Sequence, residues 1–248
     1  MSESQPELTV LIPVFNEAGN LVPLADEVAA AMNGVAAFEM IFVDDGSNDS
    51  TPAELESVQA RHANARVIRH DRRAGKSAAL TTGFRAARGD WIQTLDGDRQ
   101  NDPADAARVW QQIHAPQPPA RLGLVAGIRK RRNDGAVKWL SSRIANGVRR
   151  AMLNDATPDT GCGFKLIRRD AAVRLPFFDG MHRFLPALVR RAGYDVMQVP
   201  VNDRPRTAGR SKYGFFGRLG AGIVDLLGVF WLTRRGTRAE ATEIRRGD

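Results

Sequence analysis

The chain contains only one cysteine and four histidines among its 248 residues. A single cysteine, Cys162, excludes an intramolecular disulfide and fits a reducing compartment, and so few sulfur and imidazole ligands argue against a zinc site. Aromatic residues make up only 7% of the chain, and no nucleic-acid-binding motif is present, so we expect no nucleic-acid partner. The polar, acidic stretch 1–7 carries no secretory signal, which favours a cytoplasmic protein.

Two nucleotide-binding fingerprints are missing as well. The sequence has no Gly-x-Gly-x-x-Gly pattern, and it has no P-loop, because no phosphate-cradling run of glycines precedes Gly75 and Lys76. Neither a dinucleotide-binding protein nor a P-loop NTPase is therefore indicated.

The net charge of +8 is unevenly distributed along the chain. Residues 129–150 contain eight basic side chains and one acidic side chain, and residues 204–248 contain ten basic and four acidic ones. The rest of the chain is therefore net acidic. An acidic body with two basic segments indicates anionic partners that are bound locally, such as phosphates or a membrane surface.

Buried strands and helices alternate through the first half of the chain, which is 43% apolar overall and can bury one sizeable core. Apolar runs predict strands, and 3.6-residue patterns predict helices, one of them capped by Thr51. The expected strands are 8–13, 40–43, 67–68 and 92–95; the expected helices are 20–32, 52–61, 77–88 and one that begins near 102. This alternation predicts a doubly wound, mostly parallel α/β sheet.

The most informative stretch is the end of the fourth predicted strand, where Asp96, Gly97, Asp98 and Gln100 follow an apolar run. Residues two apart in an extended backbone point the same way, so the two carboxylates and the amide can share one side. Hard divalent cations such as Mg²⁺ prefer oxygen ligands of this kind, together with phosphate oxygens of a substrate. The pattern indicates a metal–diphosphate site, although a lone Asp-x-Asp can also be a solvated acidic turn.

The neighbouring turns strengthen the first of these two interpretations. Parallel sheets of this class bind ligands beyond the carboxyl ends of their strands. The acidic turns around Glu17, Asp44–Asp45 and Asp96–Asp98 all follow predicted strands, so we expect them to meet at one edge of the sheet.

The second half of the chain continues the α/β body. We expect strands at 122–127 and 196–201, helices at 138–153 and 182–192, and over 159–167 a glycine-rich approach to a short strand. The basic run from Arg129 reads as a loop, and Lys138 and Ser142 share one side of the helix that follows it. Cys162 reads as a small buried residue and His182 as a surface residue at a helix start.

The C-terminal part differs in kind from the body. Residues 204–213 form a basic linker, and residues 215–232 are strongly apolar with Arg218, Gly222 and Asp225 on one narrow polar stripe. As a helix this segment would be about 27 Å long. Its two charges favour an amphipathic helix in the plane of a membrane over a membrane span. A core or partner-binding helix is the other alternative.

With these residues laid out, the chain resembles family 2 glycosyltransferases of the dolichyl-phosphate mannose synthase type, whose bacterial relatives load sugars onto undecaprenyl phosphate. The resemblance extends from about residue 8 to residue 232. Its motifs are Pro13-Val14-Phe15-Asn16-Glu17, Asp44-Asp45-Gly46-Ser47, Gly75-Lys76 with Ala79 and Gly83, Gly89-Asp90, Asp96-Gly97-Asp98 with Gln100 and Pro103, Gly161-x-Gly163-Phe164-Lys165, and Arg206-x-x-Gly209-x-Ser211-Lys212-Tyr213.

The resemblance implies a GT-A fold, a nucleotide-diphosphate sugar donor, Mg²⁺ or Mn²⁺ as cofactor, and a polyprenyl phosphate acceptor at the inner face of the membrane. The catalytic residues it implies are Asp96, Asp98 and Arg206. The donor-binding residues it implies are Pro13, Val14, Glu17, Asp44, Asp45, Lys76, Asp96, Gly97, Arg206 and Lys212. It further places the metal on Asp96, Asp98 and Gln100, and the acceptor phosphate on Arg129, Lys138 and Ser142, with a lysine at 138 where the family usually has arginine.

The acceptor chemistry separates this expectation from its alternatives. A hydroxyl acceptor needs a general base, for which Asp155 and Asp159 are the candidates, whereas a lipid phosphate is already anionic. The Glu-Asp pair and Gln-x-x-Arg-Trp motif of hydroxyl-directed relatives are absent, which favours the phosphate and an inverting displacement. A transferase acting on a sugar hydroxyl and a non-catalytic membrane-associated module remain as alternatives.

We therefore expect three parts: a GT-A catalytic domain at 1–213, an interfacial helix at 214–235 and a disordered tail at 236–248. The helix would attach the protein peripherally to the inner face of the membrane. Whether the donor is GDP-mannose or a UDP-sugar, and how many subunits assemble, does not follow from the sequence.

Overall fold

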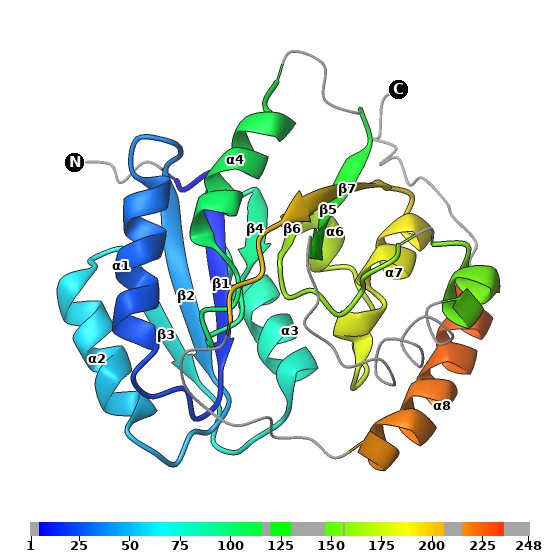
Figure 1. Ribbon diagram of the computed structural model, residues 1–248, viewed down its shortest axis with the longest axis horizontal. Helices are drawn as coiled ribbons and strands as arrows, with labels where there is room; N and C mark the ends of the chain where they lie inside the picture. Colours follow the sequence, from blue (N-terminus) through cyan, green and yellow to red (C-terminus); the bar gives the residue numbers. More distant parts are fainter. Residues whose placement is uncertain (1–4, 116–119, 130–146, 156, 206–214, 236–248) are drawn as a thin grey trace, which may run out of the picture.

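The computed structural model describes residues 5–115, 120–129, 147–155, 157–205 and 215–235, and for residues 215–221 it describes the backbone only. In this part of the chain a seven-stranded sheet has the order β3-β2-β1-β4-β6-β5-β7 (Figure 1). The strands are β1 Leu8–Val14, β2 Phe38–Asp44, β3 Ala65–Arg69, β4 Trp91–Thr94, β5 Leu122–Arg129, β6 Lys165–Arg168 and β7 Asp195–Val201.

Four of the six strand pairings are parallel and two are antiparallel. β3, β2, β1 and β4 are parallel neighbours, and β5 is parallel to β7, whereas β6 runs antiparallel to both β4 and β5. The prediction of a doubly wound, mostly parallel α/β sheet is confirmed.

Helices cover both faces of the sheet (Figure 1). They are α1 Leu21–Met32, α2 Thr51–Arg61, α3 Lys76–Ala86, α4 Pro103–Ile113, α6 Arg169–Ala172, the 3₁₀ turn η1 Met181–Arg183, α7 Leu185–Arg191 and α8 Phe215–Arg234. Residues 147–153 are also helical. Of the helix expected over 138–153, the remainder lies outside the described residues.

Two hydrophobic cores result from this arrangement, one on each face of the sheet. Successive side chains of a strand point to opposite faces. Accordingly Val10 and Ile12 of β1 pack with α1, α2 and α4, while Leu11 packs with α3 and α7. All three side chains are completely buried, so β1 lies at the centre of the fold.

Two sequence expectations about helix starts are wrong. The helix expected over 182–192 is instead the 3₁₀ turn η1 followed by α7, because Pro186 has no amide hydrogen and is tolerated only in the first turn. Thr51 is the first residue of α2 and not its cap. Its amide donates to Asp49 Oδ1 at 2.9 Å, and its hydroxyl accepts a hydrogen bond from the Glu17 amide at 2.9 Å.

The helix expected over 215–232 is present as α8. Its inner side packs on the body, where Val229 is buried, Asp225 pairs with Arg183 at 2.7 Å, and Arg191 donates to the Leu232 carbonyl at 2.9 Å. Asp225 therefore faces the protein body. No helix in the described part of the chain combines the length and apolarity that crossing a bilayer requires.

Candidate active site at the carboxyl edge of the sheet

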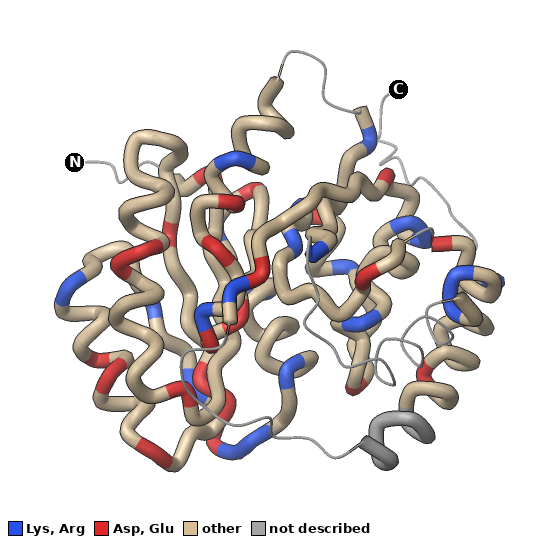
Figure 2. The backbone as a smooth tube through the Cα atoms, in the orientation of Figure 1, with Lys and Arg blue, Asp and Glu red and all other residues tan. Residues whose placement is uncertain are grey.

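Three loops meet where β1, β2 and β4 end. These strands are parallel neighbours: the pairing of Val14 with Asp44 aligns the ends of β1 and β2, and the pairing of Leu11 with Thr94 lets the residues after β4 run alongside the end of β1. The backbone trace in Figure 2 carries both acidic and basic positions along this edge. The acidic turns after the three strands therefore lie next to one another, as the parallel arrangement predicts.

The turns after β1 and β4 are in direct contact. A Cβ atom on Gly97 would lie 3.0 Å from Val14 Cγ1 and 3.4 Å from Glu17 Cγ. Glycine at this position lets the Asp-Gly-Asp turn approach the end of β1. Val14, Glu17 and Gly97, which the sequence assigns to the donor site, are thus brought together with Pro13, the residue before Val14 in β1.

The two aspartates at the end of β2, Asp44 within the strand and Asp45 directly after it, have structural partners of their own. The completely buried Asp44 accepts from the Ser47 amide at 2.9 Å. Asp45 accepts from the amides of Ala74 and Gly75 and contacts His70 Nδ1, each at 2.8 Å. Asp45 therefore organises the basic loop that leads into α3, and its role at the nucleotide stays a prediction.

Lys76 and Asp96 form the central ion pair of the site. The Lys76 Nζ atom lies 2.5 Å from Asp96 Oδ1, and both side chains are about a third exposed. Burial raises the pKa of Asp96, but the Lys76 ammonium outweighs burial and holds that pKa below its ordinary value. Burial lowers the pKa of Lys76, but Asp96 and then Asp98 outweigh it and raise that pKa.

This arrangement fits a hard divalent cation. The Lys76 ammonium already places a positive charge beside Asp96 and within the field of Asp98, which is nearly buried. The backbone N–H of Gln100 donates to Asp98 Oδ1 at 3.2 Å, and the Gln100 side chain adds an amide oxygen to the donor set. Two carboxylates and an amide suit Mg²⁺ or Mn²⁺ provided that substrate phosphates complete the shell. No group of three or more His, Cys, Asp and Glu side chains in the described ranges forms a metal site.

Two titratable groups beside this pair, the buried Lys165 and the partly buried His182, were not recognised as site residues from the sequence. Lys165 donates to the carbonyls of Thr160 and Cys162 at 3.3 and 2.5 Å, and burial lowers its pKa to about 8. Burial, followed by the charges of Lys76 and Lys165, lowers the pKa of His182 to about 3. The interpretation of His182 as a surface residue is therefore wrong, because η1 turns it toward Ser77 on α3, 2.9 Å from its Nδ1.

The backbone between Thr160 and Lys165 closes over the same place. A Cβ atom on Gly163 would lie 2.5 Å from Asp96 Cγ, so glycine is required for the segment to pass the carboxylate. Thr94 Oγ1 donates to the Gly163 carbonyl at 2.6 Å and fixes that passage. Cys162 is buried, as predicted, and burial raises the pKa of its thiol.

The region predicted to hold the acceptor phosphate contains two arginine–aspartate pairs. Arg129 Nε and Nη2 donate to Asp159 at 2.8 and 3.0 Å in a bidentate pair, and Arg149 pairs with the completely buried Asp155. Arg129 is the last residue of β5, which extends two residues beyond the strand expected over 122–127, so the expectation that Arg129 begins a loop is wrong. Four other predicted site residues lie outside the described residues: Lys138, Ser142, Arg206 and Lys212.

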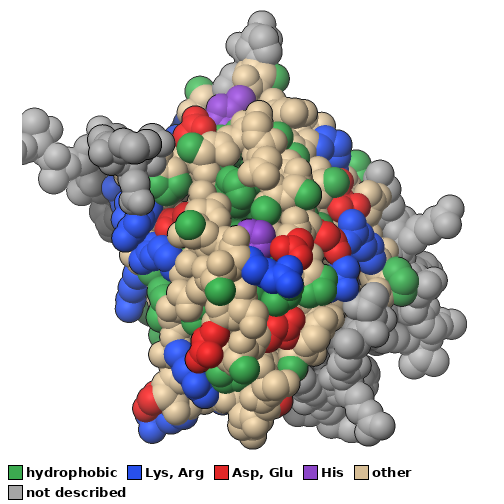
Figure 3. Space-filling model, turned by 90° about the vertical axis from the view of Figure 1, so that its left-hand side faces the viewer, with side chains coloured by type: hydrophobic (Ala, Val, Ile, Leu, Met, Phe, Trp, Pro, Cys, Tyr) green, Lys and Arg blue, Asp and Glu red, His purple; other side chains and the backbone are tan. Residues whose placement is uncertain are grey.

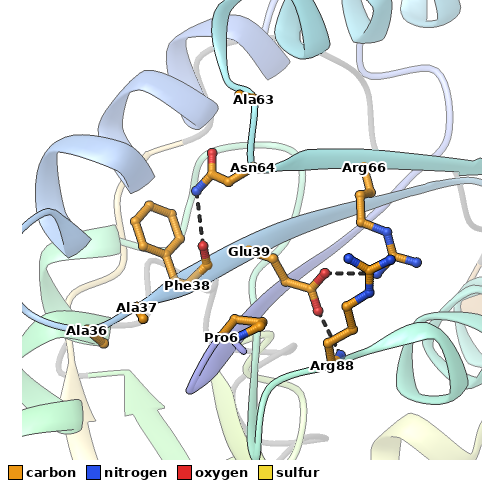
Figure 4. Close-up of a pocket in the computed structure, with 9 residues that line it drawn as sticks. All are labelled: Pro6, Ala36, Ala37, Phe38, Glu39, Ala63, Asn64, Arg66 and Arg88. Atoms are coloured by element: carbon orange, nitrogen blue, oxygen red, sulfur yellow. Dashed lines mark hydrogen bonds and ion pairs between the residues drawn. The ribbon is translucent and has the colours of Figure 1, made fainter. Parts of the chain in front are cut away.

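A cavity lies at the opposite, amino-terminal edge of the sheet. It measures about 540 Å³, and Phe38, Asn64, Arg66 and Arg88 are among its lining residues (Figure 4). Glu39 in its wall accepts from Arg66 at 2.8 Å, from the Arg88 amide at 2.7 Å and from Thr9 at 2.8 Å. These bonds link β1, β2, β3 and the segment after α3, so the Glu39 carboxylate has a structural role.

Solved structures of the same architecture define the class of the fold. The chain superposes with a TM-score of 0.67 and 20% identity on glucosyl-3-phosphoglycerate synthase from Mycobacterium tuberculosis in complex with Mn²⁺, UDP-glucose and glycerol 3-phosphate, covering 92% of this chain and 80% of that one. A mannosyltransferase from Pyrobaculum calidifontis in complex with GDP-mannose and Mn²⁺ gives 0.63 and 20%, covering 95% and 66%. The fold is GT-A, the class of nucleotide-sugar transferases.

Sequence comparison then assigns the family. The family model described as glycosyl transferase family 2 matches residues 9–175. Dodecaprenyl-phosphate galacturonate synthase from Rhizobium johnstonii is 34% identical over 233 residues, which cover 92% of this chain and 68% of that protein. Undecaprenyl-phosphate 4-deoxy-4-formamido-L-arabinose transferase from Pseudomonas fluorescens is 32% identical over 224 residues, covering 89% and 63%. The chain belongs to glycosyl transferase family 2 and spans about two thirds of the length of these relatives.

Proposed function

We propose that the protein transfers a sugar from a nucleotide-diphosphate donor to a polyprenyl phosphate, with a divalent cation and with inversion at the anomeric carbon. The names of the two relatives support the acceptor, since both contain a polyprenyl phosphate. The ligands of the two solved structures support a nucleotide-sugar donor and Mn²⁺, and they include both UDP and GDP. GDP-mannose and a UDP-sugar therefore both remain as donors.

The observation that carries this proposal is the state of the two candidate general bases. Asp155 is completely buried and paired with Arg149, and Asp159 is held by two hydrogen bonds from Arg129. Burial raises the pKa of Asp155 and outweighs the opposing effect of Arg149, but a side chain without exposed surface cannot reach an acceptor hydroxyl. Both carboxylate oxygens of Asp159 are already engaged by Arg129. A hydroxyl acceptor needs a positioned base, whereas a phosphate acceptor needs none.

The residues at the carboxyl edge have separate roles in binding the donor and the cation. Val14, Glu17 and Gly97 would form the wall against which the nucleotide binds, and Asp96, Asp98 and Gln100 would hold the cation. When bound, the cation neutralises charge that develops on the departing nucleoside diphosphate. Lys76 supplies a further positive charge next to the same oxygens.

The displacement itself requires no proton transfer. A phosphate oxygen of the acceptor forms the bond to the anomeric carbon while the bond from that carbon to the diphosphate oxygen breaks. Attack from the face opposite the leaving group inverts the configuration. Arg129 would attract the lipid phosphate, which would replace Asp159 as the bidentate partner of the guanidinium.

We further propose that α8 lies in the membrane interface beside a catalytic domain formed by residues 1–213. Ile223, Val224, Leu227 and Trp231 are 54 to 69% exposed, and they lie within about 100° of the helix circumference. Arg234 and Arg235 follow this apolar face and suit anionic headgroups. The surface at the β3 end of the sheet shows mixed charges with only scattered apolar side chains (Figure 3).

Vesicle co-sedimentation tests the membrane attachment. Val224→Asp and Leu227→Asp should each reduce binding to vesicles that contain anionic lipid, since a charge on the apolar face resists burial. Val173→Asp, at an exposed valine away from α8, is the matched control and should bind as wild type does. Equal binding of all three variants and wild type would contradict the interfacial role of α8.

Transfer assays test the reaction. Radiolabelled UDP- and GDP-sugars are incubated with the protein and undecaprenyl phosphate, with Mg²⁺, with Mn²⁺ or with a chelator. The proposal expects a glycolipid that extracts into organic solvent and forms only with the metal. Donor hydrolysis without any lipid product, across the whole panel, would favour a hydroxyl acceptor instead.

A further inference from the structure

The residue after the Asp-Gly-Asp turn has an unusual backbone conformation. Arg99 has a φ of 61°, in the left-handed region that side chains other than glycine rarely adopt. Such a conformation persists only where surrounding contacts hold it. Because Arg99 joins Asp98 to Gln100, its backbone angles decide where these two predicted metal ligands point.

The contact that holds Arg99 comes from a distant helix. Glu27 of α1 is 72 residues away in sequence, and its Oε1 accepts a hydrogen bond from Arg99 Nη2. Its Oε2 accepts from Arg204 Nη1 at 2.5 Å, across 177 residues. Arg204 Nη2 donates in turn to Asp102 Oδ1 at 2.7 Å, at the N-cap of α4. One carboxylate thus joins three segments around the turn.

The backbone on the far side of Arg99 is fixed independently. The Arg204 amide donates to the Gln100 carbonyl at 2.9 Å, and Asn101 forms an isolated antiparallel bridge with Asp203. Asn101 Oδ1 also accepts from the Asp96 amide at 3.0 Å. Both ends of the turn are therefore anchored, and the middle depends on the Arg99 side chain.

We propose that Glu27 is a positioning residue for the metal-binding turn, which it holds in shape by bridging Arg99 and Arg204. It has this role without touching the cation or the donor. The hydrogen bonds from both arginines outweigh the effect of burial and lower the pKa of Glu27, so its charge persists at neutral pH. This inference rests on the metal dependence within the proposed function.

The neighbouring residue supplies a matched control. Asp26 lies next to Glu27 on α1, and its carboxylate pairs with Arg61 and His62 on α2, at 3.4 and 2.9 Å. Asp26→Ala removes the same charge from the same helix and leaves the turn untouched. If Glu27 contributed only to the global stability of the fold, Glu27→Ala and Asp26→Ala would have similar effects on Mn²⁺ binding and on urea unfolding.

The experiment measures Mn²⁺ binding by electron paramagnetic resonance, with the metal alone and with UDP or GDP, and records urea unfolding in parallel. Glu27→Ala should weaken Mn²⁺ binding at least about tenfold, as loss of a supporting residue around a metal site does. Asp26→Ala should stay within about twofold of wild type.

A second variant separates positioning from simple loss of contacts. Glycine adopts positive φ without penalty, so Arg99→Gly supplies the turn conformation without the Glu27 bond. In the Glu27→Ala background it should restore most of the Mn²⁺ affinity. The inference is overturned if Glu27→Ala binds Mn²⁺ as Asp26→Ala does, or if Arg99→Gly restores nothing.

The readout contains no acceptor lipid, so it is separate from the transfer reaction. Glu27-dependent Mn²⁺ binding in a protein that forms no glycolipid would reject the proposed acceptor and leave the positioning role standing. Absence of Mn²⁺ binding in the wild type would overturn the positioning role itself.

Discussion

Substitution of Gly163 by alanine should disable the site while leaving the fold intact. The added Cβ atom would lie 2.5 Å from Asp96 Cγ and 2.6 Å from Oδ1, whereas unstrained carbon contacts are about 3.5 Å or longer. The Asp96 carboxylate would therefore have to retreat by about 1 Å, away from the place where Lys76 holds it.

The expected cost falls on catalysis more than on stability. A misplacement of about 1 Å in a catalytic group can lower the rate about 100-fold, which corresponds to about 2.7 kcal/mol of transition-state stabilisation. The loss in the free energy of unfolding should lie within about 1–3 kcal/mol, the usual range for overpacking by one methyl group. The retreating group is a side chain, and no backbone has to move.

Gly161→Ala is the matched control for this prediction. Its Cβ atom would be 3.7 Å from Asp159 Oδ1 and 3.8 Å from Arg129 Nη2, which are ordinary contacts. Metal-dependent turnover of the donor is measured for both variants, together with the thermal midpoint of unfolding. Turnover of the Gly163 variant within a few-fold of the Gly161 variant would refute the placement of Asp96 at the reacting centre.

Two further predictions concern other residues of the site. Asp98→Ala should abolish metal-dependent transfer and leave vesicle co-sedimentation unchanged; full metal-dependent transfer by this variant would show that the metal is held elsewhere. His182 should make stability depend on pH, because its folded pKa of about 3 lies below its ordinary value of 6.5. Between about pH 3 and pH 6.5 the imidazole is protonated in the unfolded chain and neutral in the folded protein. The stabilisation is therefore present above pH 6.5 and is lost as pH falls below 6.5. Between pH 7 and pH 5 the unfolding free energy of wild type should drop more than that of His182→Gln, by on the order of 1 kcal/mol; parallel urea titrations of both proteins would show equal drops if this account of His182 is wrong.

The sequence predicts the architecture because local patterns determine it. Buried parallel strands such as β1 are apolar on both faces and end in turns, and parallel neighbours bring those turns together. The placement of Glu17, Asp45 and Asp96 at one edge follows from that rule alone. The position of Gly97 against Val14 is a further consequence of it.

The rest of the site depends on contacts that no local pattern records. Lys165 lies beside Lys76 and Asp96 because β6 inserts antiparallel next to β4, and the bond between Glu27 and Arg204 spans 177 residues. Thr51 was expected to cap its own helix, but its hydroxyl binds the turn after β1 instead. The partners of polar side chains are determined by the tertiary structure, so residue spacing along one helix or strand cannot identify those partners.

The central claim is that a phosphate oxygen of the acceptor attacks the sugar. Nuclear magnetic resonance of the product tests it, with donor labelled by ¹³C at the anomeric carbon and undecaprenyl phosphate as acceptor. We predict a phosphodiester signal in which phosphorus couples to the labelled carbon, with an anomeric configuration opposite to that of the donor. A product whose labelled carbon is bonded to a hydroxyl-derived oxygen, with no coupling to phosphorus, would contradict the account.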